Sequence, residues 1–141
     1  MLFVTYVRLK MTNLAFILED EPTDRFVLEE RIKDIGMVPT TQSNLYDAKK
    51  HLEVTGDVYS AYFLDMQVPI WEGDSPTHKA GLALRDYLIR INVNPEKIFL
   101  MSGIVSYQDE RAAEEYGFPA NQIVGKDQLT EKFLRELLKI Q

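Results

Sequence analysis

The sequence has no cysteine and only two histidines among its 141 residues. Without cysteine, the chain can form neither disulfides nor thiolate metal sites. Its longest apolar stretches fall far short of the roughly 20 residues that a membrane-spanning helix needs. The segment Met1–Val7 is apolar but lacks the preceding basic residue and the small-residue cleavage site of a signal peptide. We therefore expect a cytoplasmic protein that is not inserted in a membrane.

Basic residues are in the minority. The chain has 16 Lys and Arg against 22 Asp and Glu, which gives a formal charge of −6, and its basic residues are scattered among acidic ones. This balance argues against direct binding of nucleic acid or of an anionic membrane. An apolar share of 45% and a charged share of 27% are typical of a globular domain. The length is that of one domain with its own core.

Short β-rich runs alternate with longer runs of helical period along the chain. This alternation predicts an α/β domain whose parallel sheet is covered by helices on both faces. Leu14–Leu18 is a continuous apolar run, as expected of a central strand buried on both faces. Four further strands are expected at Val38–Thr41, Ala61–Leu64, Lys97–Met101 and Gln122–Val124. The pattern indicates a single (βα)5 domain, with no room for an output domain.

The helices between these strands are predicted from apolar residues that recur every three or four positions. They are expected at Thr23–Ile35, Leu45–Val54, Leu82–Ile91, Ser106–Tyr116 and Thr130–Ile140. The first of these helices carries apolar residues at Phe26, Val27, Ile32 and Ile35. Ser43 or Asn44 is predicted to cap the second helix.

Two segments fall outside this repeat. Residues 1–11 precede the domain, which we place at residues 12–141. Two interpretations of Met1–Lys10 stay open: it precedes a true start at Met11, or it forms an extra strand. Gln67–Ala80 is a long polar loop, and a loop of this length is uncommon in a compact domain and often functional.

Ionisable or hydroxyl side chains follow four of the five predicted strands. Ligands of an open parallel sheet bind beyond the carboxyl ends of its strands. Singly, each of these residues has an ordinary explanation as a solvated turn, a helix cap or a loop residue. Together at one edge of one sheet they indicate a site. In chain order the set is Glu19, Asp20 and Glu21, then Asp65, Ser102 and Lys126.

The chemistry of this set favours phosphoryl transfer. Carboxylates brought within a few ångströms raise one another's pKa unless a cation neutralises them. Oxygen ligands without Cys or a positioned His favour a hard ion, and Mg²⁺ suits phosphoryl chemistry best. Lys126 supplies a compact positive charge for a phosphoryl oxygen, and Ser102 supplies a hydroxyl donor. Phosphoryl transfer needs mainly positioning and charge neutralisation, so this set would suffice.

The sequence resembles the receiver domains of bacterial response regulators, the family that includes the chemotaxis response regulator. The resemblance covers Thr12 to Ile140, and four motifs carry it, each at a strand end: Ile17–Glu21, Phe63–Pro69, Leu100–Gly103 and Val124–Lys126. It implies a flavodoxin-like, doubly wound sheet with strand order 2-1-3-4-5. It also implies a stand-alone signalling phosphoacceptor that promotes its own phosphorylation and dephosphorylation and is not otherwise an enzyme.

The resemblance assigns roles to single residues. Asp65 is expected to accept a phosphoryl group from a histidine kinase or a phosphotransfer protein. Ser102 and Lys126 are expected to sense that group. The output surface, about Tyr107–Ile140, is expected to contact a downstream protein, and in this family it often dimerises. The expected Mg²⁺ ligands are Asp20, Asp65 and the backbone carbonyl of Gln67, with Glu19 acting through water.

The sequence departs from the family pattern in three places. Asp127 stands where a proline usually follows the lysine, so we expect a trans peptide there, with Asp127 capping the last helix. Ile123 stands where the family often has an aromatic switch residue, which points to another signalling route. About eight residues are inserted between Trp71 and Lys79, ahead of Gly81, which is expected to open the third helix. We interpret the insertion as a partial lid or a partner-contact arm anchored by Trp71, or as a tolerated insertion.

Three alternative functions fit the sequence less well. A phosphorylation-independent binding module of the same fold stays open as the alternative. A phosphatase of the haloacid dehalogenase type would carry its nucleophile in a D-x-D pattern after the first strand. The sequence there is Glu19-Asp20-Glu21, which leaves Asp65 unexplained. A flavin carrier is disfavoured because this acidic run would repel the flavin phosphate.

Overall fold

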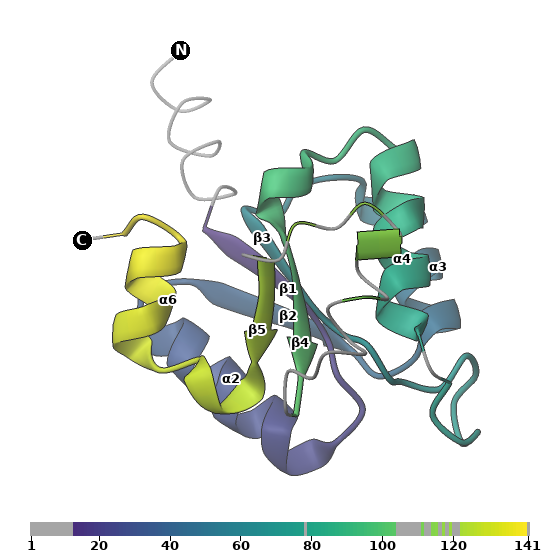
Figure 1. The fold of residues 1–141 in the computed structure, drawn as a ribbon, viewed down its shortest axis with the longest axis horizontal. Helices are drawn as coiled ribbons and strands as arrows, with labels where there is room; N and C mark the ends of the chain where they lie inside the picture. The colour runs from purple at the N-terminus through teal and green to yellow at the C-terminus, as the bar shows by residue number, and fades with distance from the viewer. Residues whose placement is uncertain are drawn as a thin grey trace.

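The computed structural model describes residues 13–77, 79–103, 111, 114, 115, 117, 119 and 122–140. Its centre is a five-stranded parallel sheet in the order β2-β1-β3-β4-β5, as predicted (Figure 1). The strands are β1 (Leu14–Leu18), β2 (Val38–Gln42), β3 (Ala61–Asp65), β4 (Ile98–Ser102) and β5 (Ile123–Gly125). The extension predicted at residues 1–11 lies outside the described residues.

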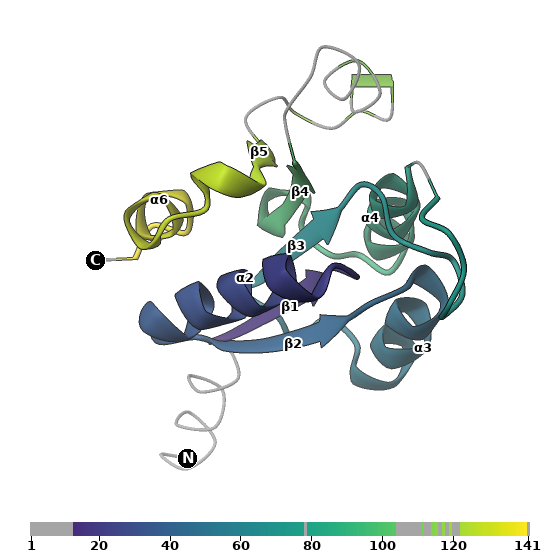
Figure 2. The ribbon, with the colours of Figure 1, turned by 90° about the horizontal axis from the view of Figure 1, so that it is seen from below.

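Helices cover both faces of the sheet (Figure 2). One face carries α2 (Pro22–Asp34) and α6 (Glu131–Leu137), and the other carries α3 (Leu45–Thr55) and α4 (Ala80–Arg90). Two short 3₁₀ helices, η1 (Pro95–Lys97) and η3 (Lys126–Gln128), precede β4 and follow β5. The helix expected at Ser106–Tyr116 lies mostly outside the described residues. None of the described helices is both long and apolar enough to cross a membrane.

The two central strands divide the core into two layers. All of β3 and the last four residues of β1 are buried, which confirms the central strand predicted at Leu14–Leu18. Because side chains alternate along a strand, Phe16 and Tyr62 pack under α3 and α4, whereas Ile17 and Phe63 pack under α2 and α6. Both faces of the sheet are therefore buried, so a site open to a ligand must lie at an edge of the sheet.

The core-facing side of α2 carries only part of the apolar set of this helix. Leu28 and Ile32 are buried, whereas Phe26 is 64% and Val27 is 36% exposed. The helix begins at Pro22, and Leu28 and Ile32 are one turn apart on the face toward the sheet. Phe26 lies about 200° around the helix from Leu28, since each residue adds about 100°. It therefore points to solvent.

Helix caps confirm one prediction and correct another. Asn44 caps α3, since its side chain accepts a hydrogen bond from the Asp47 backbone N–H at 2.8 Å. The cap of α6 is Thr130, whose hydroxyl accepts from the Phe133 N–H at 3.2 Å. Asp127 is not that cap, because it lies within η3, three residues too early. No peptide bond in the described part of the chain is cis, which agrees with the trans peptide expected before Asp127.

Candidate functional site

Three carboxyl groups converge at the carboxyl edge of the sheet. Glu19 and Asp20 follow β1, and Asp65 ends β3, the neighbouring parallel strand. One oxygen from each lies within 4.8 Å of the other two. Glu19 is 1% exposed and Asp65 is 6% exposed, while Asp20 is half-buried. The convergence predicted from the strand ends is therefore present in the fold.

Lys126 binds this acidic cluster from the other side of β4. Its Nζ donates hydrogen bonds to Glu19 Oε1 at 2.7 Å and to Asp65 Oδ2 at 2.8 Å. It donates a third to Asp24 Oδ2 at 3.1 Å. Sequence reasoning missed Asp24, which lies in the first turn of α2. An acidic residue in the first turn of a helix is favoured by the helix dipole even where there is no site, so nothing in the pattern distinguishes Asp24.

Burial controls the protonation of Glu19. Burial raises the pKa of its carboxyl to about 10, and Asp65 acts in the same direction, against the ammonium of Lys126. Glu19 Oε2 is buried and has no hydrogen-bond partner among the described residues. Burial also raises the pKa of Asp20. Burial lowers the pKa of Lys126, but its hydrogen bonds to Asp65 and Glu19 outweigh this effect, and the pKa is raised.

The other carboxylate oxygen of Asp65, Oδ1, accepts a hydrogen bond from the backbone. The backbone N–H of Gln67 donates to Asp65 Oδ1 at 3.0 Å, so both carboxylate oxygens are oriented. Gln67 therefore lies at the site, although its role as a carbonyl ligand stays a prediction. Ser102 ends β4 beside Gly125 and follows Met101, the residue in register with Asp65. This places Ser102 on the expected edge, and its sensing role stays a prediction.

Gly81 brings α4 against the end of β3, beside Asp65. It is the second residue of α4, near the predicted start, and its N–H donates to Met66 O at 3.2 Å. A Cβ added to Gly81 would overlap the carbonyl oxygen of Asp65 and lie 2.9 Å from its carbonyl carbon. Only glycine fits this approach. Ile123, the first residue of β5, is packed in the core layer under α3 and α4.

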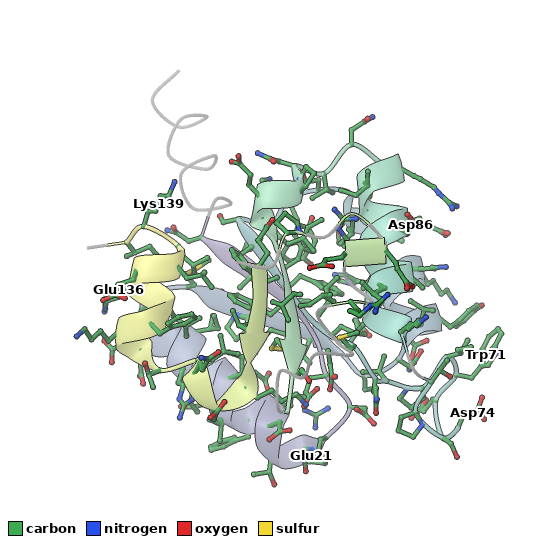
Figure 3. The ribbon with its side chains drawn as sticks, viewed as in Figure 1. Glu21, Trp71, Asp74, Asp86, Glu136 and Lys139 are labelled. Carbon is green, nitrogen blue, oxygen red and sulfur yellow. The ribbon has the colours of Figure 1, made fainter. Side chains whose placement is uncertain are left out.

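The inserted loop turns away from the site. Its Pro69 and Ile70 carbonyls accept hydrogen bonds from the backbone N–H groups of Leu45 and Tyr46, the first residues of α3, both at 2.9 Å. Figure 3 shows Trp71 and Asp74 projecting at the edge of the molecule, well apart from Glu21 beside the acidic cluster. The described part of the loop therefore does not lie over the acidic cluster, which disfavours the interpretation as a lid. The interpretations as a contact arm and as a tolerated insertion both stay open.

A cavity of about 350 Å³ gives access to the cluster between α2 and η3. Glu19, Asp24 and Lys126 line its polar part, and Val27 and Leu129 line its apolar part. Arg31 closes one side, where its Nη1 donates to Leu129 O at 2.8 Å. Glu19 and Lys126 therefore face a cavity on the α2 side of the sheet.

Comparisons with solved structures decide the fold. The chain is similar to a CheY-like response regulator receiver domain protein from Methanospirillum hungatei JF-1, with 14% identity, a TM-score of 0.67 and coverage of 91% of both chains. The chain has the receiver-domain fold. The beryllofluoride-activated NtrC4 receiver domain dimer matches with 19% identity and a TM-score of 0.65, over 89% of this chain and 93% of that one.

A response regulator from Burkholderia pseudomallei, solved with a phosphorylated aspartic acid, a calcium ion and citrate, also shares the receiver fold. It is 19% identical, with a TM-score of 0.62, over 89% of this chain and 66% of that chain. The sequence matches no protein-family model and no curated protein. At these identities the likeness establishes the receiver fold alone.

The donor set suits a divalent cation bound by oxygen. Four carboxyl groups, those of Glu19, Asp20, Asp24 and Asp65, face the single ammonium of Lys126. The unpartnered, buried Oε2 of Glu19 adds a free acceptor. An excess of negative oxygen ligands without sulfur or imidazole is the environment that Mg²⁺ or Ca²⁺ prefers.

Proposed function

We propose that this chain is a phosphorylatable receiver in which Asp65 accepts a phosphoryl group and the modified domain signals by protein–protein contact. One observation carries the proposal: Asp65 lies in a largely buried cluster where an ammonium and two further carboxyl groups meet it. A buried carboxylate with a purely structural role would need only one cationic partner. Here it is surrounded by the groups that phosphoryl chemistry needs.

The residues of the chain have separable tasks in this reaction. An oxygen of Asp65 forms the bond to phosphorus while the bond from phosphorus to the donor breaks, and the donor leaves with that electron pair. The Gln67 N–H orients the carboxylate. Lys126, already 2.8 Å from Asp65 Oδ2, compensates the charge of the incoming phosphoryl oxygens. Glu19, Asp20 and Asp65 would hold a Mg²⁺ ion, which when bound neutralises phosphoryl charge.

Two of the similar structures support this chemistry. The Burkholderia pseudomallei protein carries a phosphorylated aspartic acid beside a calcium ion, and the NtrC4 receiver is activated by beryllofluoride as a dimer. By analogy we assign the donor as a histidine kinase or a phosphotransfer protein. The output surface would include β5 and α6, within the predicted range Tyr107–Ile140. A homodimer through that surface fits the same analogy.

Intact mass tests the proposal most directly. The full chain is incubated with acetyl phosphate, with and without Mg²⁺, beside Asp65→Asn and the control Asp86→Asn, an exposed carboxylate on α4. We expect one added phosphoryl group in the wild type and in Asp86→Asn, which requires Mg²⁺ and is absent in Asp65→Asn. If the folded wild type gained no mass, the proposal would be wrong and the phosphorylation-independent module would take its place.

A further inference from the structure

An exposed aromatic patch lies where the inserted loop meets α3. We define it by Tyr46, Ile70 and Trp71, whose side chains are 44%, 40% and 53% exposed. The Tyr46 and Trp71 ring centroids are 4.2 Å apart, with 31° between the ring planes. Large apolar side chains gathered in contact at a surface, rather than scattered, mark a site of interaction.

The patch is built on a well-supported loop. Backbone hydrogen bonds at 2.9 Å join Tyr46 N–H to Ile70 O and fix the two parts of the patch together. Across the base of the loop, Val68 and Thr77 form an antiparallel bridge, with Thr77 N–H donating to Val68 O at 2.9 Å. A surface that is organised before binding loses less conformational entropy when a partner arrives.

Negative charge surrounds the aromatic rings. Glu72 and Asp74 are exposed at the tip of the loop directly after Trp71, and the seven residues from Ile70 to Pro76 contain no cation. Figure 3 shows Trp71 and Asp74 extending from the same loop at the edge of the molecule. On α3, Lys49 and Lys50 both lie one turn after Tyr46, and Lys49 Nζ lies over the Tyr87 ring at 5.9 Å from its centroid.

We propose that the aromatic patch docks a protein segment that carries arginine. A guanidinium group binds an aromatic face by stacking and cation–π attraction, and it pairs with carboxylates in the same geometry. Glu72 and Asp74 supply those carboxylates, and Ile70 offers contact for an adjoining apolar side chain. A second copy of this chain fits less well, because each copy carries a formal charge of −6 and the two patches repel.

This docking surface is separate from the candidate phosphorylation site. The patch lies at the start of α3, whereas the cavity lined by Glu19 and Lys126 lies between α2 and η3 on the other face of the sheet. A segment bound to the patch leaves that cavity open. Binding therefore does not require Asp65, and the two activities can be tested independently.

Trp71 is the only tryptophan in the chain and reports on the patch directly. We would titrate the full chain with an octa-arginine peptide, with octa-glutamate as the control, and follow tryptophan emission. The expected result is a saturable emission change with octa-arginine alone, which Asp65→Asn retains. Fluorescence anisotropy of a labelled octa-arginine then gives the affinities of the variants.

Three variants separate the patch from general charge attraction. Trp71→Ala, and the double change Glu72→Gln with Asp74→Asn at the exposed tip, are each expected to weaken binding about tenfold. The matched control is Glu53→Gln with Glu136→Gln, which removes two exposed carboxylates elsewhere and should change the affinity less than about twofold. Equal weakening in both double variants, an unchanged tryptophan emission, or self-association without peptide that Trp71→Ala abolishes would overturn the proposal.

Discussion

Replacing Gly81 with alanine should damage both the stability of the chain and its candidate phosphorylation site. The added Cβ would lie 2.9 Å from the Asp65 carbonyl carbon and 3.1 Å from Met66 Cα. Carbon atoms pack at about 3.5–4.0 Å, so α4 and the end of β3 must separate by roughly 0.5–1 Å. The atoms in the way are backbone, which cannot rotate aside as a flexible side chain could.

The expected loss follows from two opposing terms. Overpacking costs about 1–3 kcal/mol, and alanine in place of glycine in a helix returns at most about 1 kcal/mol. We therefore expect the free energy of unfolding of Gly81→Ala, measured by urea titration, to fall by about 2 kcal/mol. Displacing the Asp65 backbone should also slow phosphorylation by acetyl phosphate, by up to about 100-fold, because the reaction depends on the position of the nucleophile.

A substitution in the reverse direction on the same helix provides the control. Ala83 is exposed on α4, so Ala83→Gly should cost about 1 kcal/mol of stability through helix propensity alone and leave the phosphorylation rate unchanged. If Gly81→Ala were as stable as the wild type and equally reactive, α4 would not approach Asp65 as closely as described. The close contact between Gly81 and the Asp65 backbone would then not be present in the folded chain.

Three further substitutions test single interactions. Since the pKa of Glu19 is raised to about 10, the folded chain keeps a proton that the unfolded chain releases above 4.5. The free energy of unfolding should therefore fall as pH rises between these values, by up to about 1.4 kcal/mol per unit, and urea titrations of Glu19→Gln should lack this slope. Asn44→Ala, which removes the cap of α3, should lower the same free energy by about 1 kcal/mol, whereas Ser43→Ala should leave it unchanged. Lys126→Met leaves the buried carboxyl groups without their ammonium and should lower the thermal midpoint at pH 7, by an amount equivalent to about 3 kcal/mol; a midpoint equal to that of the wild type would contradict this account.

The strand-end chemistry could be predicted because parallel strands bring their carboxyl ends to one edge. Glu19, Asp20, Asp65 and Lys126 each follow a strand, so their convergence needed only the strand order. Asp24 could not be found in this way, because it belongs to a helix and enters the site only through the reach of Lys126. The convergence predicted from the strand ends is therefore confirmed, whereas the contact of Asp24, which depends on the reach of the Lys126 side chain, was not predicted.

Other expectations depended on details that periodicity does not contain. The exposure of Phe26 depends on which face of α2 meets the sheet. Leu28 is on that face, and Phe26, two residues earlier, lies about 200° around the helix from it. The direction of the loop is set by Leu45 and Tyr46, whose backbone N–H groups at the start of α3 donate hydrogen bonds to carbonyl oxygens of the loop. The sequence shows that these groups exist but not what binds them.

The pairing of Lys126 with Glu19 spans 107 positions of the chain. A ribosome adds about 5–20 residues each second, so the carboxyl groups leave it several seconds before the ammonium that balances them. Contacts between such distant residues also form late in folding, because a long loop must be closed first. The edge of the sheet that carries the acidic cluster can therefore be completed only after Lys126 has left the ribosome, near the end of synthesis.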